Sequence, residues 1–171
     1  MFSNPEHNVD QFDIYPGMSI ADFGAGSGYY TIAGAKAVGG SGRVYAIEVQ
    51  KDLLEKIKSQ ATHQHLQNIE YIWGDIEKLG GTRIKDASID RVIASNVLFQ
   101  LHDKKSFCNE IKRVLKPGGK ALCIDWSDTS PLGPQSLITT ETAKELFHSA
   151  GFAFSSSINA GDHHYGLIFI K

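Results

Sequence analysis

The stretch Ile20-Ala21-Asp22-Phe23-Gly24-Ala25-Gly26-Ser27-Gly28 decides the fold of this chain. It starts in an apolar run of strand length, passes through a Gly-x-Gly-x-Gly turn, and continues into a segment of helical period that extends to about Val38. A strand that enters a helix through such a turn brings backbone N–H groups close to a ligand, and the N-terminus of the helix favours negative charge. We therefore expect an α/β fold with a ligand site at the end of this strand.

Four further runs of strand length follow, separated by segments of helical period. We expect these strands at residues 43–48, 69–73, 89–95 and 120–126. Leu54 and Ile57 mark one of the helices between them. Asp103 can cap another helix, whose apolar face ends at Leu115 before a turn at residues 116–119. This alternation is typical of a parallel sheet that is covered by helices on both faces.

The last part of the chain has a different pattern. Thr139 or Thr140 can cap a helix that ends at Gly151, and two strands are expected at residues 152–156 and 165–170. The gap between these two strands is too short for a crossover helix, because a parallel connection needs roughly a dozen residues or more. They should therefore form an antiparallel hairpin at the end of a mostly parallel sheet.

Composition predicts one soluble domain. The 171 residues are 42% hydrophobic and 21% charged, and the net charge of −2 argues against a broad nucleic-acid-binding face. No apolar stretch approaches the roughly 18 residues of a membrane span, and the N-terminus lacks a basic and apolar leader, so we expect a cytoplasmic protein. Cys108 and Cys123 lie in apolar segments, which is typical of buried free thiols. We interpret residues 1–171 as a single domain, with residues 1–18 as a lid segment ahead of a core at 19–171.

Carboxylates follow three of the expected strands. Asp22 precedes the first glycine of the turn by two residues, Glu48 ends the second strand, and Asp75 follows the third strand. Successive parallel strands deliver their carboxyl ends to the same edge of a sheet, so these three side chains should meet there. Their convergence strengthens the prediction of a binding site.

Two kinds of nucleotide ligand compete for this site. A nicotinamide or flavin fingerprint, G-x-G-x-x-G/A, needs Gly or Ala at position 29, and this chain has Tyr29. Three convergent carboxylates without a nearby arginine suit a ligand that is cationic at one end. S-adenosylmethionine carries an ammonium, a sulfonium and a carboxylate, and it has no pyrophosphate.

These motifs carry a resemblance to a known family. They are Asp-Phe-Gly-Ala-Gly-Ser-Gly at 22–28, the acid at Glu48, Gly-Asp-Ile at 74–76, the fourth strand at 90–96, and Leu-Lys-Pro-Gly-Gly at 115–119. Over about residues 15–171 the sequence resembles the class I S-adenosylmethionine-dependent methyltransferases, in particular the small ones similar to the methyltransferase domain of ubiquinone and menaquinone biosynthesis enzymes. The resemblance implies a Rossmann-like, doubly wound, seven-stranded sheet of order 3-2-1-4-5-7-6 with strand 7 antiparallel.

The resemblance also implies a set of cofactor contacts. Asp22 would fix the ammonium of S-adenosyl-L-methionine, and Glu48 would take both ribose hydroxyls, so that its removal weakens binding with little effect on the stability of the free protein. Asp75 would hold the exocyclic amine of the adenine, and Asn96 would line the methyl-transfer side. The predicted cofactor-binding residues are Asp22, Gly24, Ala25, Gly26, Gly28, Tyr30, Glu48, Val49, Gly74, Asp75, Ile76 and Asn96.

Catalysis by such an enzyme depends first on placement. Methyl transfer from a sulfonium is an in-line displacement, which requires the nucleophile roughly 3 to 3.5 Å from the methyl carbon in a dry pocket. A general base helps when the acceptor is a hydroxyl or a protonated amine, and histidines are the first candidates. The catalytic candidates are His163 and His164, at the turn into the last strand, together with Asn96 and His102. A polar turn is the alternative interpretation of the histidine pair, and no histidine has companions at metal-ligand spacing, so we expect no metal site.

The acceptor is described only by class. Segment 95–99 lacks the Asn/Asp-Pro-Pro-aromatic signature of many methyltransferases that modify nucleic-acid bases, and the resembling arsenic methyltransferases rely on several cysteines. An aromatic rim suits a small apolar or aromatic acceptor. Its expected members are Pro5, Phe12, Tyr15, Tyr29, Tyr30, Phe99, Trp126 and the loop at 131–134. The predicted function is methyl transfer to a small molecule; the alternatives are a cofactor-binding partner or subunit without catalysis, and an RNA or protein methyltransferase.

Overall fold

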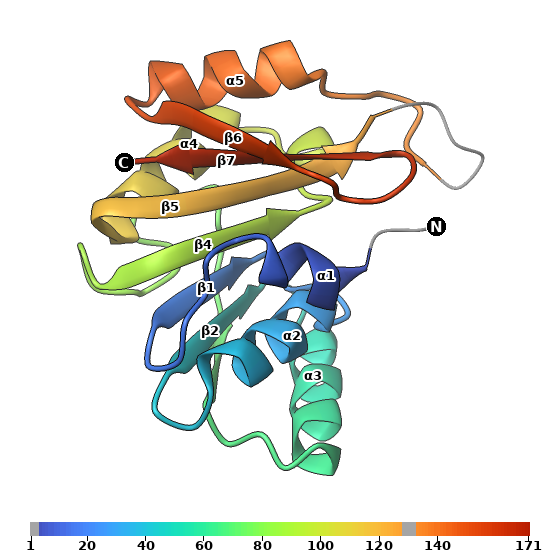
Figure 1. Ribbon diagram of the computed structural model, residues 1–171, viewed down its shortest axis with the longest axis vertical. Helices are drawn as coiled ribbons and strands as arrows, with labels where there is room; N and C mark the ends of the chain where they lie inside the picture. The colour runs from blue at the N-terminus through green and yellow to red at the C-terminus, as the bar shows by residue number, and fades with distance from the viewer. Residues whose placement is uncertain (1–3, 128–132) are drawn as a thin grey trace.

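The computed structural model describes residues 4–127 and 133–171, which form a seven-stranded sheet with helices on both faces (Figure 1). The helices are α1 (Pro5–Asp10), α2 (Tyr29–Val38), α3 (Lys51–His63), α4 (Lys104–Val114) and α5 (Thr140–Ser149), and a 3₁₀ turn, η1 (Leu98–Gln100), follows the fourth strand. The strands are β1 (Ser19–Phe23), β2 (Arg43–Glu48), β3 (Ile69–Trp73), β4 (Ile89–Ser95), β5 (Leu115–Trp126), β6 (Ala153–Ile158) and β7 (His164–Ile170). No helix within the described ranges is long and apolar enough to cross a membrane.

The strand order is β3-β2-β1-β4-β5-β7-β6. β1 pairs in parallel with both β2 and β4, and β7 lies antiparallel between β5 and β6. This confirms the predicted Rossmann-like sheet, its order and its antiparallel seventh strand. Because the chain leaves β1 toward β2 and later returns to β4 on the other side, a crevice opens beyond the carboxyl ends of these strands.

The two faces of the sheet bury different helices. Along β1 successive side chains point to opposite faces: Ile20 packs among the apolar side chains of α2 and α3, whereas Phe23 packs among those of α4 and α5. α1 covers a third cluster, in which Val9 and Phe12 pack with β4 and β5. The central strands are therefore covered on both faces, which explains their nearly continuous apolar sequences.

The junction between α4 and β5 differs from the prediction. Leu115 was expected in the apolar face of the helix, but its backbone is extended (φ −67°, ψ 138°) and it begins β5 opposite Ile89. Residues 116–119, expected as a turn, lie within the strand, where the β4–β5 register shifts between Ile89 and Arg91. This segment behaves as a bulge, because Pro117 has no N–H for the ladder and Gly118 adopts a positive φ of 72°.

The predicted lid segment contains a helix that its sequence did not indicate. α1 has six residues, most of them polar, so it is too short to show a helical period. It is held by tertiary contacts: the Asn8 side chain donates to the Tyr30 hydroxyl of α2 at 2.7 Å, and Gln11 exchanges two hydrogen bonds with the backbone of Asn159. The contact between Asn8 and Tyr30 holds α1 against α2.

Gly28 connects the glycine turn to the helices. It caps the N-terminus of α2 with a φ of 83°, and a Cβ at this position would lie 2.6 Å from the Ile57 side chain of α3. The third glycine of the motif is therefore required for the backbone conformation and for the close approach of α3.

We expect Gly28→Ala to lower the stability of the protein by about 2 kcal/mol or more, because it combines left-handed strain with overpacking against Ile57. Urea denaturation measures this difference. Gly118→Ala is the control, since Gly118 also has a positive φ, of 72°, with nothing within 4 Å of an added Cβ. Equal losses in the two variants would contradict the role of the Ile57 contact.

Candidate functional site

A cavity of about 510 Å³ opens at the carboxyl ends of β1, β2, β3 and β4. Its volume is within the range of pockets that hold small ligands and cofactors. Its wall contains all of the predicted cofactor-binding residues except Gly28: Asp22, Gly24, Ala25, Gly26, Tyr30, Glu48, Val49, Gly74, Asp75, Ile76 and Asn96. The sheet therefore brings the motif residues of four strands to one place, and their individual roles stay predictions.

The glycine turn forms the floor of the cavity. A Cβ at Gly24 would lie 2.6 Å from the Val97 side chain, so this glycine lets the segment after β4 approach β1. Gly26 is different, because the only atom near an added Cβ would be the Gly24 carbonyl oxygen at 3.9 Å. Both residues have a positive φ. Gly26 therefore leaves open space into which a ligand can approach the backbone.

Glu48 organises the backbone around it. Its Oε2 accepts the N–H of Gly26 at 3.0 Å, and its Oε1 accepts those of Val49 at 2.8 Å and Gln50 at 3.0 Å. The side chain therefore joins the glycine turn to the start of α3, and Oε2, which accepts one N–H, keeps lone-pair capacity for a ligand donor. The expectation that its removal leaves the free protein equally stable does not fit these contacts.

Asp22 is a buried carboxylate at the centre of the site. Burial raises its pKa to about 6, against the lowering effect of the Thr31 hydroxyl, which donates to Oδ2 at 2.6 Å; the Glu48 charge also raises it. The charged form is therefore disfavoured in the free protein. A cationic group beside Asp22 would stabilise that charge, so this end of the cavity suits an ammonium.

The segment after β3 forms a third wall. The Asp75 carboxylate accepts the Glu77 N–H at 2.9 Å and pairs with the Lys78 ammonium at 3.0 Å, and both contacts lower its pKa. Asp75, Ile76 and Glu77 all line the cavity. Across the opening, Val49 is 55% exposed, which leaves an apolar surface for a flat ring.

Asn96 ends β4 in a left-handed conformation with a φ of 57°. Its backbone N–H donates to the Ile124 carbonyl at 2.8 Å, and its carbonyl accepts from the Gln100 side chain at 2.7 Å. Its side-chain Oδ1 is buried and has no protein partner among the described residues. Asparagine tolerates a left-handed conformation better than most residues, so the backbone strain of this conformation is small at Asn96.

The three histidine candidates are absent from the cavity wall. His102 is exposed and donates its backbone N–H to Glu77. The His164 ring packs on Trp126 with centroids 4.4 Å apart, and the carbonyl of His163 accepts the Ser127 N–H at 2.8 Å. Because β5 separates β7 from β4, this turn lies two strands away from β4, and a role as base stays a prediction.

Several wall residues were not predicted. They are Ser27, Ile47, Gln50, Leu53, Glu77, Ser95, Val97, Gln100 and Leu101. Most of them lie one to five positions from a motif residue in the sequence. This proximity was the signal from which they could have been predicted as wall residues. Of the expected rim, Pro5, Tyr29 and Tyr30 reach the wall, whereas Phe12, Tyr15, Phe99 and Trp126 do not. Residues 131 and 132 of the predicted rim loop lie outside the described ranges.

The two cysteines lie in the core. Burial raises the pKa of Cys108 to about 12, and it raises that of Cys123 well above the ordinary value. Neither lines the cavity, and within the described residues no cluster of three His, Cys, Asp or Glu side chains is arranged to hold a metal. The thiols therefore have no thiolate character with which to act as ligands or nucleophiles.

Comparison with known proteins identifies the family. The family described as "Methyltransferase domain" matches residues 14–157 of the chain. This chain belongs to that family. The match covers every strand that lines the cavity, and it confirms the class I methyltransferase resemblance of the motifs.

Individual relatives agree with this assignment. The methyltransferase domain is 27% identical over 150 residues to the arsenite methyltransferase of Halobacterium salinarum, covering 80% of this chain and 38% of that protein. It is 31% identical over 121 residues to the demethylmenaquinone methyltransferase of Bacillus mycoides, covering 71% of this chain and 50% of that protein. The chain thus spans about half of the length of these curated relatives, or less.

A solved structure matches nearly the whole chain. The crystal structure of a SAM dependent methyltransferase from Aquifex aeolicus superposes with a TM-score of 0.88 at 25% sequence identity. The match covers 99% of this chain and 90% of that one. The short methyltransferase domain therefore has a structural counterpart of similar length.

Because Asp22 is buried, we predict that Asp22→Asn raises the stability of the protein by an amount that depends on pH. A pKa raised from 3.8 to about 6 means that the folded protein binds the proton of Asp22 more tightly than the unfolded chain does. The protonated Asp22 therefore contributes its full stability below pH 4, and this contribution is lost as the pH rises through 6. The variant should therefore be more stable than wild type by up to about 3 kcal/mol at pH 8, at 1.36 kcal/mol per pKa unit. The difference should vanish near pH 4.

Urea denaturation of both proteins from pH 4 to pH 8 measures this difference. Asp90→Asn is the control, because Asp90 is a partly buried aspartate outside the cavity that pairs with Lys116. A difference between wild type and Asp22→Asn that stays constant with pH would show that burial does not perturb Asp22.

Proposed function

We propose that this methyltransferase domain transfers a methyl group from S-adenosyl-L-methionine to a small apolar acceptor. S-adenosyl-L-methionine is the cofactor. The observation that carries the proposal is the convergence of Asp22, Glu48 and the open backbone at Gly26 in one cavity. Such a cavity would select a ligand that carries a positive charge, a pair of hydroxyl groups, and a chain that can lie close against the protein backbone.

The wall fits the parts of the cofactor in order along the sheet edge. Asp22 would stabilise the ammonium, because it is the buried carboxylate with the raised pKa. Glu48 would accept from the ribose hydroxyls, with Oε2 as the oxygen that has an open lone-pair site, and Gly26 would let the methionine part lie against the backbone. Val49 and Ile76 would contact the two faces of the adenine, and Asp75 would accept from its exocyclic amine.

The chemistry requires little more from the protein than placement. The bound cofactor supplies a methyl group on a positively charged sulfur. The residues of the wall then orient the acceptor in line with that methyl group and keep water out, which contributes more than a dedicated base when the nucleophile is already electron-rich. A base becomes necessary only for a hydroxyl or a protonated amine, and His163, His164 and His102 stay the candidates for that case.

The acceptor side of the cavity is apolar and aromatic. Tyr29, which is 67% exposed, lines the cavity together with Tyr30, Val97, Leu101 and Asn96. A ring with one polar substituent fits this surface, since the Asn96 amide offers the polar contact. The demethylmenaquinone methyltransferases among the relatives are named for an acceptor of this kind.

Three alternatives carry less support. The Halobacterium relative is named an arsenite methyltransferase. Both cysteines of this chain are buried away from the cavity, so thiols to bind arsenite at the site are missing from the described residues. The net charge of −2 supplies no broad basic face for RNA. A partner protein that binds the cofactor without catalysis would have the same cavity, and it would differ from an enzyme only in the absence of turnover.

Methyl transfer is tested with radiolabelled S-adenosyl-L-methionine. We expect calorimetry to show that S-adenosylhomocysteine binds. We expect the label to be transferred to a reduced naphthoquinone and not to arsenite. Binding without transfer to any extract pool would support the non-catalytic partner, and label in RNA or protein would support those substrates. Tight NAD binding without a response to either methionine nucleoside would overturn the cofactor assignment.

Glu48→Gln should weaken S-adenosylhomocysteine binding at least about tenfold, because charge-assisted hydrogen bonds to the ribose contribute roughly 1.5 to 3 kcal/mol each. The substitution should also lower the melting temperature of the free protein. In the wild type three backbone N–H groups donate to the carboxylate, whereas in the variant some of them would face the amide NH₂ group, which cannot accept. Calorimetry and thermal denaturation measure the two effects.

Glu70→Gln is the matched control for Glu48→Gln. Glu70 lies on the neighbouring strand β3 and pairs with Arg43 at the surface. We expect it to change neither property by a comparable amount, because exposed ion pairs contribute little. An unchanged dissociation constant in Glu48→Gln would remove Glu48 from the ligand site, whatever its effect on stability.

A further inference from the structure

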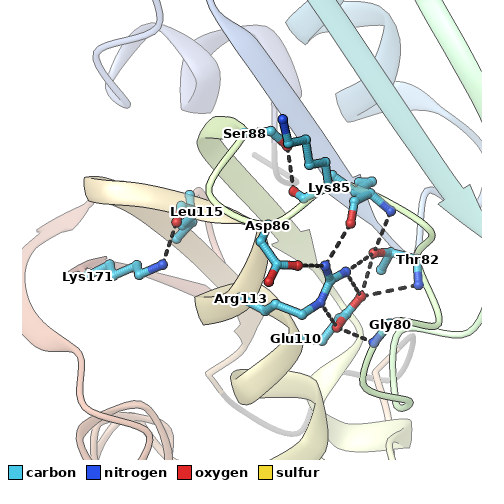
Figure 2. Close-up of polar contacts among 10 residues, drawn as sticks. Gly80, Thr82, Lys85, Asp86, Ser88, Glu110, Arg113, Leu115 and Lys171 are labelled. Carbon is cyan, nitrogen blue, oxygen red and sulfur yellow. Dashed lines mark hydrogen bonds and ion pairs between the residues drawn. The ribbon is translucent and has the colours of Figure 1, made fainter.

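α4 carries an ion pair, on the side of the sheet away from α2 and α3, in which the carboxylate is fully buried and the arginine is 18% exposed. Glu110 has no exposed surface, and Arg113 donates to both of its oxygens, from Nε at 2.8 Å and from a terminal nitrogen at 2.7 Å (Figure 2). A bidentate pair of this kind holds both side chains in one geometry. Neither residue lines the cavity, so the family's cofactor motifs do not account for the pair.

The same carboxylate binds the loop between β3 and β4. Glu110 accepts the backbone N–H of Gly80 at 2.7 Å and that of Thr82 at 3.2 Å, and it also accepts the Thr82 hydroxyl. Arg113 donates to the Ile84 carbonyl at 2.7 Å. Figure 2 shows these contacts converging on the pair from the loop. The ion pair therefore fixes the loop against α4.

The loop in turn packs on the wall of the cavity. The Asp75 N–H donates to the Gly81 carbonyl at 3.2 Å. A Cβ at Gly74 would lie 2.6 Å from that carbonyl oxygen, and a Cβ at Gly81 would lie 2.2 Å from the Asp75 carbonyl oxygen. The two backbones are thus in direct contact, so a movement of the loop moves the wall.

A second contact joins this wall to the beginning of α4. Glu77, which lines the cavity, accepts the backbone N–H groups of His102 and Asp103, and Asp103 caps α4. The wall at Gly74–Glu77 is therefore fastened to the same helix at two points. One of them is Glu77 itself, and the other is the Glu110–Arg113 pair acting through the loop.

We propose that Glu110 and Arg113 are positioning residues of the cofactor site, which determine adenine recognition by holding the Gly80–Thr82 loop against the Gly74–Glu77 wall. The proposal rests on the function proposed above, in which Asp75 and Ile76 meet the adenine. The pair touches no ligand atom. Its effect is to set where the Asp75 carboxylate and the Ile76 side chain stand relative to the ring.

A role in general stability makes a different prediction from a role in positioning. General loosening weakens every ligand of the cavity alike. Displacement of one wall weakens the preference for adenine, and it leaves the contribution of the amino-acid end, which is bound at Asp22 and Gly26, unchanged. The ratio of dissociation constants between matched ligands separates the two.

The experiment uses calorimetry with three probes on the folded protein. S-adenosylhomocysteine is the reference, S-inosylhomocysteine replaces the exocyclic amine by an oxygen, and 5′-methylthioadenosine lacks the amino-acid end. The variants are Glu110→Gln and the milder Thr82→Val, which removes the hydroxyl contact with little change in shape. Lys112→Met is the matched control, because Lys112 fastens the same helix to the Ala150 carbonyl of the α5 end.

Wild type should bind S-adenosylhomocysteine more tightly than S-inosylhomocysteine, and this preference should fall at least about threefold in Thr82→Val and further in Glu110→Gln. The preference over 5′-methylthioadenosine should stay within error, and Lys112→Met should retain both preferences. Failure of wild type to bind S-adenosylhomocysteine would overturn the proposed function itself.

Two results would overturn the positioning role while leaving the proposed function intact. One is an adenine preference that survives in both folded variants, and the other is an equal weakening of all three probes. If Glu110→Gln does not fold, Thr82→Val decides the question, because it keeps the buried ion pair.

Discussion

The carboxylate of Glu48 is the interaction on which the site depends. It lies at the end of β2 and accepts backbone N–H groups from Gly26 in the glycine turn and from Val49 and Gln50 at the entry to α3. Three separate pieces of backbone are thereby held around one side chain. A strand end, a turn and a helix start become one rigid surface, and the open position at Gly26 stays aligned with the acid that would bind the ribose.

This arrangement places the Glu48 carboxylate near that of Asp22, which has a cost for the free protein. Asp22 is buried with a raised pKa, and the Glu48 charge contributes to that rise. Under the proposed function the same conflict would favour a ligand with a positive charge, because such a ligand would stabilise the charge that the protein alone disfavours. Function and stability would then be opposed at Asp22, as is common at binding sites.

The opposite wall is maintained from a distance. The Gly74–Glu77 segment has no regular structure of its own, and its position is determined by the loop that follows it and by α4 on the far face of the sheet. The wall that we propose for the acceptor adjoins the same helix, since Gln100 and Leu101 lie three and two residues before its cap at Asp103. α4 thus links the two ends of the cavity through backbone contacts, although its residues from Lys104 onward do not line it.

The sequence patterns determined the strands and the residues that gather at the edge of the sheet, and the resemblance to a known family supplied the strand order. Strand-length apolar runs, the glycine turn and acids at strand ends are local patterns, and parallel topology brings them together whatever the details of packing. Tertiary structure alone decided the rest: α1 is too short for a period, and Leu115 became a strand residue because pairing with Ile89 outweighed helical propensity. The Glu110–Arg113 pair could not be foreseen either, because an acid and a base three residues apart on a helix look like an ordinary surface pair until a loop buries them.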